Sequence, residues 1–181
     1  MRTGQDLIWR DDDIYMTKSL RDDRHFYSYE QFKKVHQMIR ERGFIHTLAI
    51  IASEIDKYPE FTKYLLEHKN EFSFQLHGLE HSDYSLWQEE DAIYMALEKA
   101  KGIIEKTFDT KVSTFYAPYN KITDKIRSVC ARLGLEVNED YVTPEQWLMG
   151  KRSKTINFHY WAVKEGQVDA LRQVLEQYEK I

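Results

Sequence analysis

The chain has 181 residues, of which 42% are hydrophobic and 31% are charged, and its formal net charge is −4. This composition predicts one folded globular domain that spans residues 1–181. The net negative charge, without a long basic block, argues against electrostatic binding of nucleic acid. Cys130 is the single cysteine, so an intrachain disulfide and a thiolate zinc site are both excluded.

No stretch of the sequence is long and apolar enough to span a membrane, and residues 1–13 lack the apolar core of a signal peptide. The default expectation is therefore a cytoplasmic protein without a membrane partner. The sequence leaves the oligomeric state open.

Strand and helix patterns alternate along the whole chain. Short apolar runs predict strands at residues 6–10, 44–52, 72–76, 112–116, 135–137 and 155–163. Apolar residues at spacings of three and four predict helices at residues 28–43, 58–68, 87–108, 123–133 and 167–179. Residues 14–26 and 138–152 are expected to be irregular. This alternation favours a mostly parallel sheet with helices outside it, as an open doubly wound sheet or as a barrel.

An acidic triplet, Asp11–Asp13, follows the first predicted strand. By itself such a triplet is as consistent with a solvated turn or a helix cap as with a functional site. In parallel α/β folds, however, ligands bind at the carboxyl ends of the strands. The position of the triplet therefore makes it a candidate site.

A second candidate site follows the third predicted strand, where His77 and His81 are four residues apart. This spacing can put two imidazoles on one side of a single helical turn. Two solvated histidines in a polar loop are the alternative. Together with one carboxylate, the pair would make a three-ligand site that keeps room for water, which is the pattern of catalytic zinc.

Two more unusual groups are predicted at the same edge of the sheet. Pro118 and Tyr119 follow the fourth predicted strand, and His159 lies within the sixth. A metal that activates water, a carboxylate that accepts a proton and a histidine that donates one are sufficient to hydrolyse an amide or an ester. A satisfied core histidine is the alternative for His159.

The four motifs resemble those of the polysaccharide deacetylase family, the NodB-homology or carbohydrate esterase family 4 type. That family has an Asp-Asp pair, a His-x-x-x-His motif, an Arg-x-Pro-Tyr-type motif and a late leucine-histidine motif, in this order. The counterparts here are Asp12-Asp13, residues 77–81, residues 116–119 and Phe158-His159. The resemblance covers nearly the whole chain and implies a (β/α) barrel. Because the loops are short, we expect a distorted or incomplete barrel with mostly parallel strands.

Residue by residue, the resemblance implies that Asp13, His77 and His81 bind a divalent metal, with zinc expected before cobalt, nickel, iron or manganese. Asp12 would be the general base and His159 the general acid. The implied reaction is hydrolysis of an N-acetyl or O-acetyl group on a carbohydrate, in which water activated by the metal attacks the acetyl carbonyl. The triplet also allows the pair to be Asp11-Asp12.

For the substrate, the resemblance implies that the backbone N–H of Tyr119, next to Pro118, stabilises the oxyanion. Tyr116 could stack on a sugar ring, although core packing is the alternative. Tyr116 also stands where the family has an arginine that pairs with the catalytic aspartate. Arg10 is the nearest cation that could replace it.

Other departures leave alternatives open. Gly78 replaces the usual serine or threonine after the first histidine, and Asp140 is the only nearby candidate for the aspartate that orients the general acid. The chain could instead hydrolyse a non-sugar amide C–N bond, or be a catalytically degenerate module that binds carbohydrate or a protein partner. His36, His46 and His68 are expected on the surface or on helices without a role, and so is His25.

Overall fold

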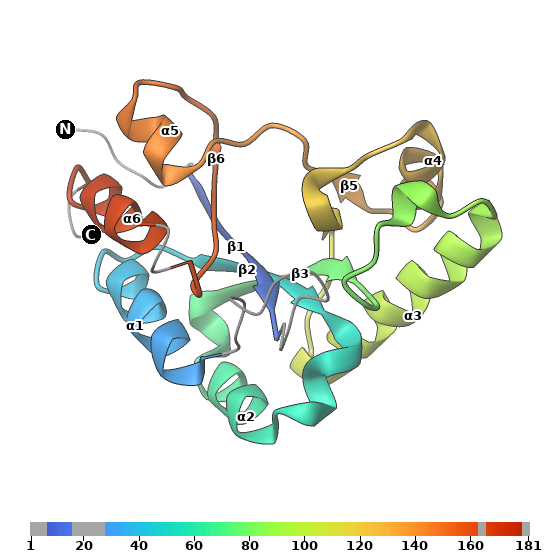
Figure 1. Cartoon of the computed structure of the whole chain (residues 1–181). Helices are drawn as coiled ribbons and strands as arrows, with labels where there is room; N and C mark the ends of the chain where they lie inside the picture. Colours follow the sequence, from blue (N-terminus) through green and yellow to red (C-terminus); the bar gives the residue numbers. More distant parts are fainter. Residues whose placement is uncertain (1–6, 16–27, 163–165, 179–181) are drawn as a thin grey trace.

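The computed structural model describes residues 7–15, 28–162 and 166–178. Its strands form one six-stranded, entirely parallel sheet in the order β5-β4-β3-β2-β1-β6 (Figure 1). The strands are β1 (Ile8–Ile14), β2 (His46–Ile51), β3 (Phe72–Gly78), β4 (Thr114–Phe115), β5 (Glu136–Val137) and β6 (Thr155–Phe158).

The strand order identifies the architecture as an incomplete (β/α) barrel. From β1 to β5 each strand pairs with the next one in the chain, and β6 returns to pair with β1. A closed barrel would have this cyclic order, but here β5 and β6 are not paired and the sheet stays open between them. The prediction of an α/β fold with a distorted or incomplete barrel of parallel strands is therefore confirmed.

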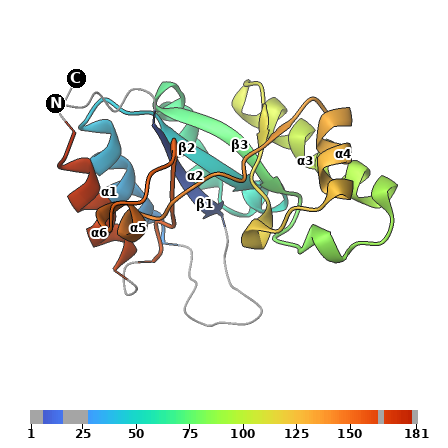
Figure 2. The ribbon, with the colours of Figure 1, turned by 90° about the horizontal axis from the view of Figure 1, so that it is seen from above.

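Helices cover the outside of the curled sheet, as Figures 1 and 2 show. They are α1 (Tyr29–Arg40), α2 (Pro59–Glu67), α3 (Glu90–Phe108), α4 (Asp124–Arg132), α5 (Pro144–Leu148) and α6 (Gln167–Leu175). Short 3₁₀ turns lie at η2 (Ala52–Lys57), η3 (Lys69–Glu71), η4 (Tyr84–Leu86) and η5 (Pro118–Asn120). None of the helices in the described part of the chain is long and apolar enough to cross a membrane.

The predicted bounds of several elements differ from those in the structure, among them β1 and β6, and one helix was not predicted. Strand β1 continues through the acidic triplet to Ile14, so the aspartates belong to the strand. Strand β6 ends at Phe158, which puts His159 just beyond the strand rather than inside it. Helix α5 lies within residues 138–152, where Thr143 and Gln146 form a capping box. The predicted irregular segment 14–26 lies almost wholly outside the described residues.

The alternation of side chains along β1 separates two environments. Trp9 and Asp11 face the outer helical layer, where Trp9 contacts Tyr178 and Asp11 contacts His46. Arg10 and Asp12 face the concave side of the sheet, where Arg10 reaches residues that follow the non-adjacent strand β4. All four β1 residues are buried. One strand thus contributes an aromatic ring and a carboxyl group to the outer layer and an ion pair to the concave side.

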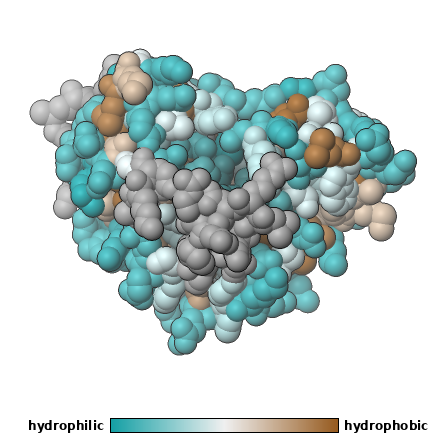
Figure 3. Space-filling view, viewed as in Figure 1, coloured by the Kyte–Doolittle hydropathy of each residue, from teal (hydrophilic) through white to brown (hydrophobic). Residues whose placement is uncertain are grey.

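On the face drawn in Figure 3, hydrophilic residues dominate the visible surface and hydrophobic ones form small, separate patches. The apolar core lies between the sheet and its helices and includes Leu48, Phe74, Ile104 and Val174. Buried Asp12, Asp13 and His77 lie at the carboxyl ends of β1 and β3.

Candidate metal centre and its surroundings

Asp13 lies at an irregular point of β1. The pairing of β1 with β2 shifts between Asp11 and Ile14, and Asp13 adopts a positive φ of 60°. A positive φ is uncommon for residues other than glycine, although aspartate tolerates it better than most. This irregularity lets Asp12 and Asp13 both contribute to the carboxyl edge of the sheet, which strict alternation would not allow.

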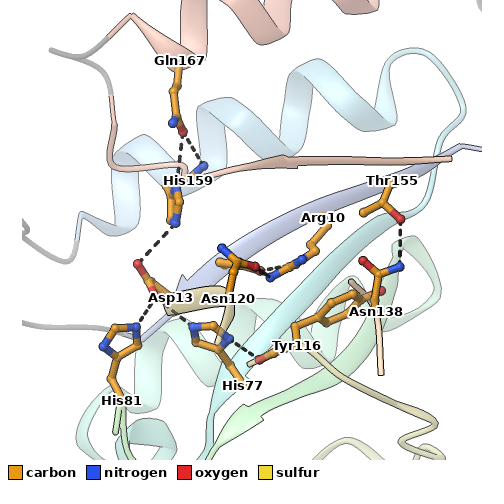
Figure 4. A network of polar contacts seen from close by, with 11 residues as sticks. Arg10, Asp13, His77, His81, Tyr116, Asn120, Asn138, Thr155, His159 and Gln167 are labelled. Carbon is orange, nitrogen blue, oxygen red and sulfur yellow. Dashed lines mark hydrogen bonds and ion pairs between the residues drawn. The ribbon is translucent and has the colours of Figure 1, made fainter. Parts of the chain in front are cut away.

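Three side chains converge at this edge, Asp13 from β1, His77 from β3 and His81 from the turn that follows β3 (Figure 4). Oδ1 of Asp13 lies 3.0 Å from Nε2 of His77 and 2.9 Å from Nε2 of His81. One ligand atom from each residue lies within 4.8 Å of the others. His77 and Asp13 are buried, whereas His81 is 21% exposed. The cluster is therefore held by the fold on one side and open to solvent on the other.

The hydrogen bond of His77 to the backbone fixes which of its nitrogens is free. Nδ1 of His77 lies 2.7 Å from the carbonyl oxygen of Tyr116, which can only accept, so Nδ1 donates. In the neutral ring Nε2 then carries a lone pair, and it faces a carboxylate oxygen 3.0 Å away. Two lone pairs at this distance require a cation between them, which is either a proton or a metal ion.

The electrostatics favour an ionised carboxylate at this point. Burial alone would raise the pKa of Asp13, but the contacts with His77 and His81 outweigh it and hold this pKa well below its ordinary value. One carboxylate and two imidazoles are a known donor set for an open zinc site. The three residues therefore fit a divalent metal by donor type, convergence and burial.

The segment that carries His81 is a tight turn rather than the helical turn that the spacing suggested. Gly78 ends β3 with a φ of 117°, and a Cβ atom there would lie 2.7 Å from the hydroxyl oxygen of Tyr84. That hydroxyl accepts from the N–H of Leu79 and donates to the carbonyl of Glu80. Tyr84 therefore ties the turn together from within and occupies the space that a larger residue at position 78 would need.

Asp12 is paired with Arg10, two residues earlier on the same strand. Nε of Arg10 donates to Oδ1 of Asp12 at 2.6 Å, and a second nitrogen donates to Oδ2 at 2.5 Å. The guanidinium also donates to Oδ1 of Asn120 at 3.0 Å and lies 4.3 Å from the centre of the Tyr116 ring. Arg10 is completely buried. The cation suggested by the sequence as the replacement for the missing arginine thus contacts Asp12.

The segment after β4 contributes backbone atoms as well as side chains. Tyr116 is 2% exposed, its ring packs on Arg10, and its carbonyl orients His77. Pro118 is buried, and Tyr119 is 48% exposed with its ring 4.7 Å from that of His81. Among the described residues, no hydrogen bond engages the N–H of Tyr119. This N–H is therefore available to an external acceptor.

His159 lies on the other side of Asp13 from the histidine pair, as Figure 4 shows. Its Nε2 is 3.6 Å from Oδ2 of Asp13, and the side chain is 23% exposed. Its Nδ1 faces Oε1 of Gln167 at 3.2 Å. Asp140, the residue suggested by the sequence for this contact, has an exposed side chain. Only a contact across the tertiary structure could have identified Gln167, because no motif precedes it.

Asp11 faces away from this centre. Its Oδ1 accepts from the N–H of Tyr160 at 2.9 Å, and its Oδ2 lies 3.1 Å from Nε2 of His46. Burial raises the pKa of Asp11 and lowers that of His46 to about 3, so both groups favour their neutral forms.

Two histidines that the sequence left without a role are completely buried and make specific contacts. His46 packs on Phe32 and contacts Asp11, and His36 contacts the hydroxyl of Tyr64 at 2.7 Å. In contrast to the expectation, His46 therefore lies neither on the surface nor on a helix, whereas His36 lies on helix α1 but is buried. His25 lies outside the described residues.

Comparison with known proteins gives a family match. The model of the family described as polysaccharide deacetylase matches residues 21–138, which is more than half of the chain. No curated protein matches the chain.

Solved structures with a similar fold include enzymes and a pseudoenzyme. The carbohydrate esterase family 4 pseudoenzyme from Bacillus anthracis has a TM-score of 0.72 and 13% identity, over 98% of this chain and 64% of that one. A family 4 carbohydrate esterase from Streptomyces lividans has a TM-score of 0.68 and 15% identity, over 94% of this chain and 88% of that one. The peptidoglycan deacetylase PdaC from Bacillus subtilis has a TM-score of 0.69 and 17% identity, over 99% of this chain and 88% of that one. At these identities the similarity shows the fold alone, and the chain spans less than two thirds of the pseudoenzyme.

Proposed function

Because the chain belongs to the polysaccharide deacetylase family, we propose that it is a metal-dependent hydrolase that removes N-acetyl or O-acetyl groups from a carbohydrate. The observation that carries the proposal is the convergence of Asp13, His77 and His81 at the carboxyl edge of the sheet. Asp12 and His159 lie next to them in sequence or in space. Residues 1–181 would form one catalytic domain.

In this proposal Asp13, His77 and His81 hold the divalent metal, with zinc preferred by the donor set. The metal would lower the pKa of a water molecule and polarise the acetyl carbonyl. The carbonyl of Tyr116 keeps Nε2 of His77 directed at Asp13, and both would then be ligands of the metal. Pairing Asp12 with Asp13, rather than Asp11 with Asp12, is supported by the contacts of Asp11 on the outer face.

The remaining steps belong to this chain's own residues. Asp12, held by Arg10, accepts a proton from the attacking water as its oxygen bonds to the acetyl carbon. The free N–H of Tyr119 donates to the oxyanion that forms. His159 donates a proton from Nε2 to the leaving nitrogen or oxygen as its bond to carbon breaks. Acetate and the deacetylated sugar are the products.

Acetylated carbohydrate is the substrate class best supported by the similar structures, whose names include carbohydrate esterase and peptidoglycan deacetylase. The exposed ring of Tyr119, next to the ring of His81, offers a flat apolar face to a sugar. Tyr116 in this proposal supports Arg10 and His77, since its ring and carbonyl already contact them.

The test measures acetate release from chitin oligosaccharides, peptidoglycan fragments and acetylated xylan with added Zn²⁺ or Co²⁺. We expect release that depends on metal, and a His81→Ala variant that remains folded but loses both metal uptake and activity. Metal-loaded protein that releases no acetate from any of them would refute the carbohydrate substrate. Turnover of small amides instead would favour the non-sugar alternative, and protein that takes up no metal would favour a non-catalytic binding module.

A further inference from the structure

Gln167, at the start of α6, contacts His159, the residue that directly follows β6. Oε1 of Gln167 lies 3.1 Å from the backbone nitrogen of His159 and 3.2 Å from Nδ1 of the same residue. Gln167 is the first residue of α6, and its own N–H donates to the carbonyl of Ala162 at 3.2 Å. One amide oxygen thus contacts two atoms of a single histidine (Figure 4).

The backbone contact identifies the atoms. A peptide N–H can only donate, so the glutamine atom that faces the nitrogen of His159 must be the oxygen rather than the amide nitrogen. Because an amide oxygen can only accept, Nδ1 of His159 must carry the hydrogen. In the neutral ring this leaves the lone pair on Nε2, which faces Oδ2 of Asp13 at 3.6 Å.

We propose that Gln167 is a positioning residue that holds His159 in the tautomer protonated at Nδ1, so that Nε2 is the nitrogen that exchanges a proton with the substrate. The inference rests on the proposed function, in which His159 is the general acid. Gln167 does not touch the reacting atoms and acts only through the imidazole. A neutral amide here supports both charge states of the ring, because each of them has a hydrogen on Nδ1.

The loop that carries His159 has other supports, so the loss of Gln167 need not unfold it. Asp11 accepts from the N–H of the next residue, Tyr160, and the carbonyl of His159 accepts from the N–H of Ala162 at 3.0 Å. The ring of Trp161 lies 4.7 Å from that of His159. These contacts hold the backbone and lie next to the ring, but none of them selects the tautomer.

The test compares three variants of the full chain with the parent, and a fourth variant assigns the signal of His159. Gln167→Leu removes the acceptor, Gln167→Glu keeps an acceptor oxygen, and Gln173→Leu makes the same change at an exposed position of the same helix. Long-range ¹H–¹⁵N correlation spectra at about pH 9, above the ordinary histidine pKa, report the tautomer of each histidine. His159→Gln assigns the signal. Spectra are recorded without metal and with Zn²⁺.

We expect the Nδ1–H tautomer for His159 in the parent chain and in the Gln167→Glu and Gln173→Leu variants, and a mixed population in Gln167→Leu. In Gln167→Leu we also expect kcat to fall roughly 10- to 100-fold, with KM and metal content little changed. An Nε2–H tautomer in the parent chain, or an unchanged tautomer in Gln167→Leu, would overturn the inference. A tautomer that depends on Gln167, in a metal-loaded protein without hydrolytic activity, would support the hydrogen-bond assignment and refute the proposed function instead.

Discussion

The guanidinium of Arg10 makes several contacts at once. It binds both carboxylate oxygens of Asp12, donates to Asn120 and packs on Tyr116, all without exposure to solvent. A planar, two-point contact of this kind fixes the carboxylate in orientation as well as in position. A lysine ammonium cannot reproduce it, because it is a point charge on a flexible stem.

We therefore expect Arg10→Lys to retain metal binding but to lower kcat by about tenfold or more, because Asp12 loses its fixed orientation. The measurements are metal stoichiometry and acetate release, with circular dichroism to confirm folding. The matched Arg→Lys control is the exposed Arg132, whose guanidinium lies over the ring of Tyr94. Equal kcat in the Arg10→Lys variant and the parent chain would contradict the proposed role of the bidentate pair.

At the scale of the element, β1 distributes four consecutive charged residues over two environments. Strict alternation sends Asp11 outward to His46 and Arg10 and Asp12 inward. The irregular pairing before Ile14 and the positive φ of Asp13 then bring a second consecutive aspartate to the site. The strand irregularity therefore decides which two members of the triplet act together.

Asparagine substitutions at two members of the triplet test this assignment with the same small chemical change. Asp13→Asn should abolish or strongly weaken Zn²⁺ uptake, because the anionic ligand is lost. Asp11→Asn should leave Zn²⁺ stoichiometry unchanged, because its Oδ1 can still accept from Tyr160. Calorimetric titration with Zn²⁺ measures both. If Asp13→Asn kept the metal and Asp12→Asn lost it, the pair would be shifted by one residue to Asp11-Asp12.

For the molecule as a whole, the layer between the sheet and α1 contains buried histidines. His36 contacts Tyr64 through Nδ1, and its Nε2 lies 3.0 Å from Oε2 of Glu71. Burial, aided by the neighbouring His46, holds the pKa of His36 well below its ordinary value. The pKa of Glu71 is also low, because His68 and His36 outweigh the opposing effect of burial.

Both shifts make the fold sensitive to acid. A histidine with a depressed pKa binds its proton more readily when unfolded, so its contribution is complete above about pH 6.5 and is lost as the pH falls. The lowered pKa of Glu71 also makes the folded state less stable as the pH falls, but at lower pH values. We expect His36→Gln to flatten the dependence of unfolding free energy on pH between about 6.5 and 4, by up to about 1.4 kcal/mol per pH unit. Urea unfolding at several pH values measures this.

A comparison at pH 8 separates this titration from packing. There His36 is neutral in both states, so any difference between the variant and the parent chain reports the altered contacts alone. Parallel stability curves from pH 8 down to about pH 4 would contradict the prediction.

Local pattern predicted most of the elements and the edge at which the site lies. The alternation of apolar runs and periodic helices indicated a parallel sheet, and parallel strands bring their carboxyl ends together. Asp13, His77, His81 and His159 meet there for that reason. The errors fell where local pattern is weak: the end of β6, the short helix α5 and the extension of β1 through three aspartates.

The sequence by itself determined the parallel α/β class and the residue types at the site, because hydrophobic periodicity and donor chemistry are local properties. Only the tertiary structure decided that Asp11 faces outward, that Arg10 binds Asp12, and that Gln167 contacts His159. A run of three aspartates carries no mark of which one faces the site, since a single strand irregularity changes the alternation. Contacts such as that of α6 with the end of β6 depend on how the layers pack, and no spacing along the chain encodes them.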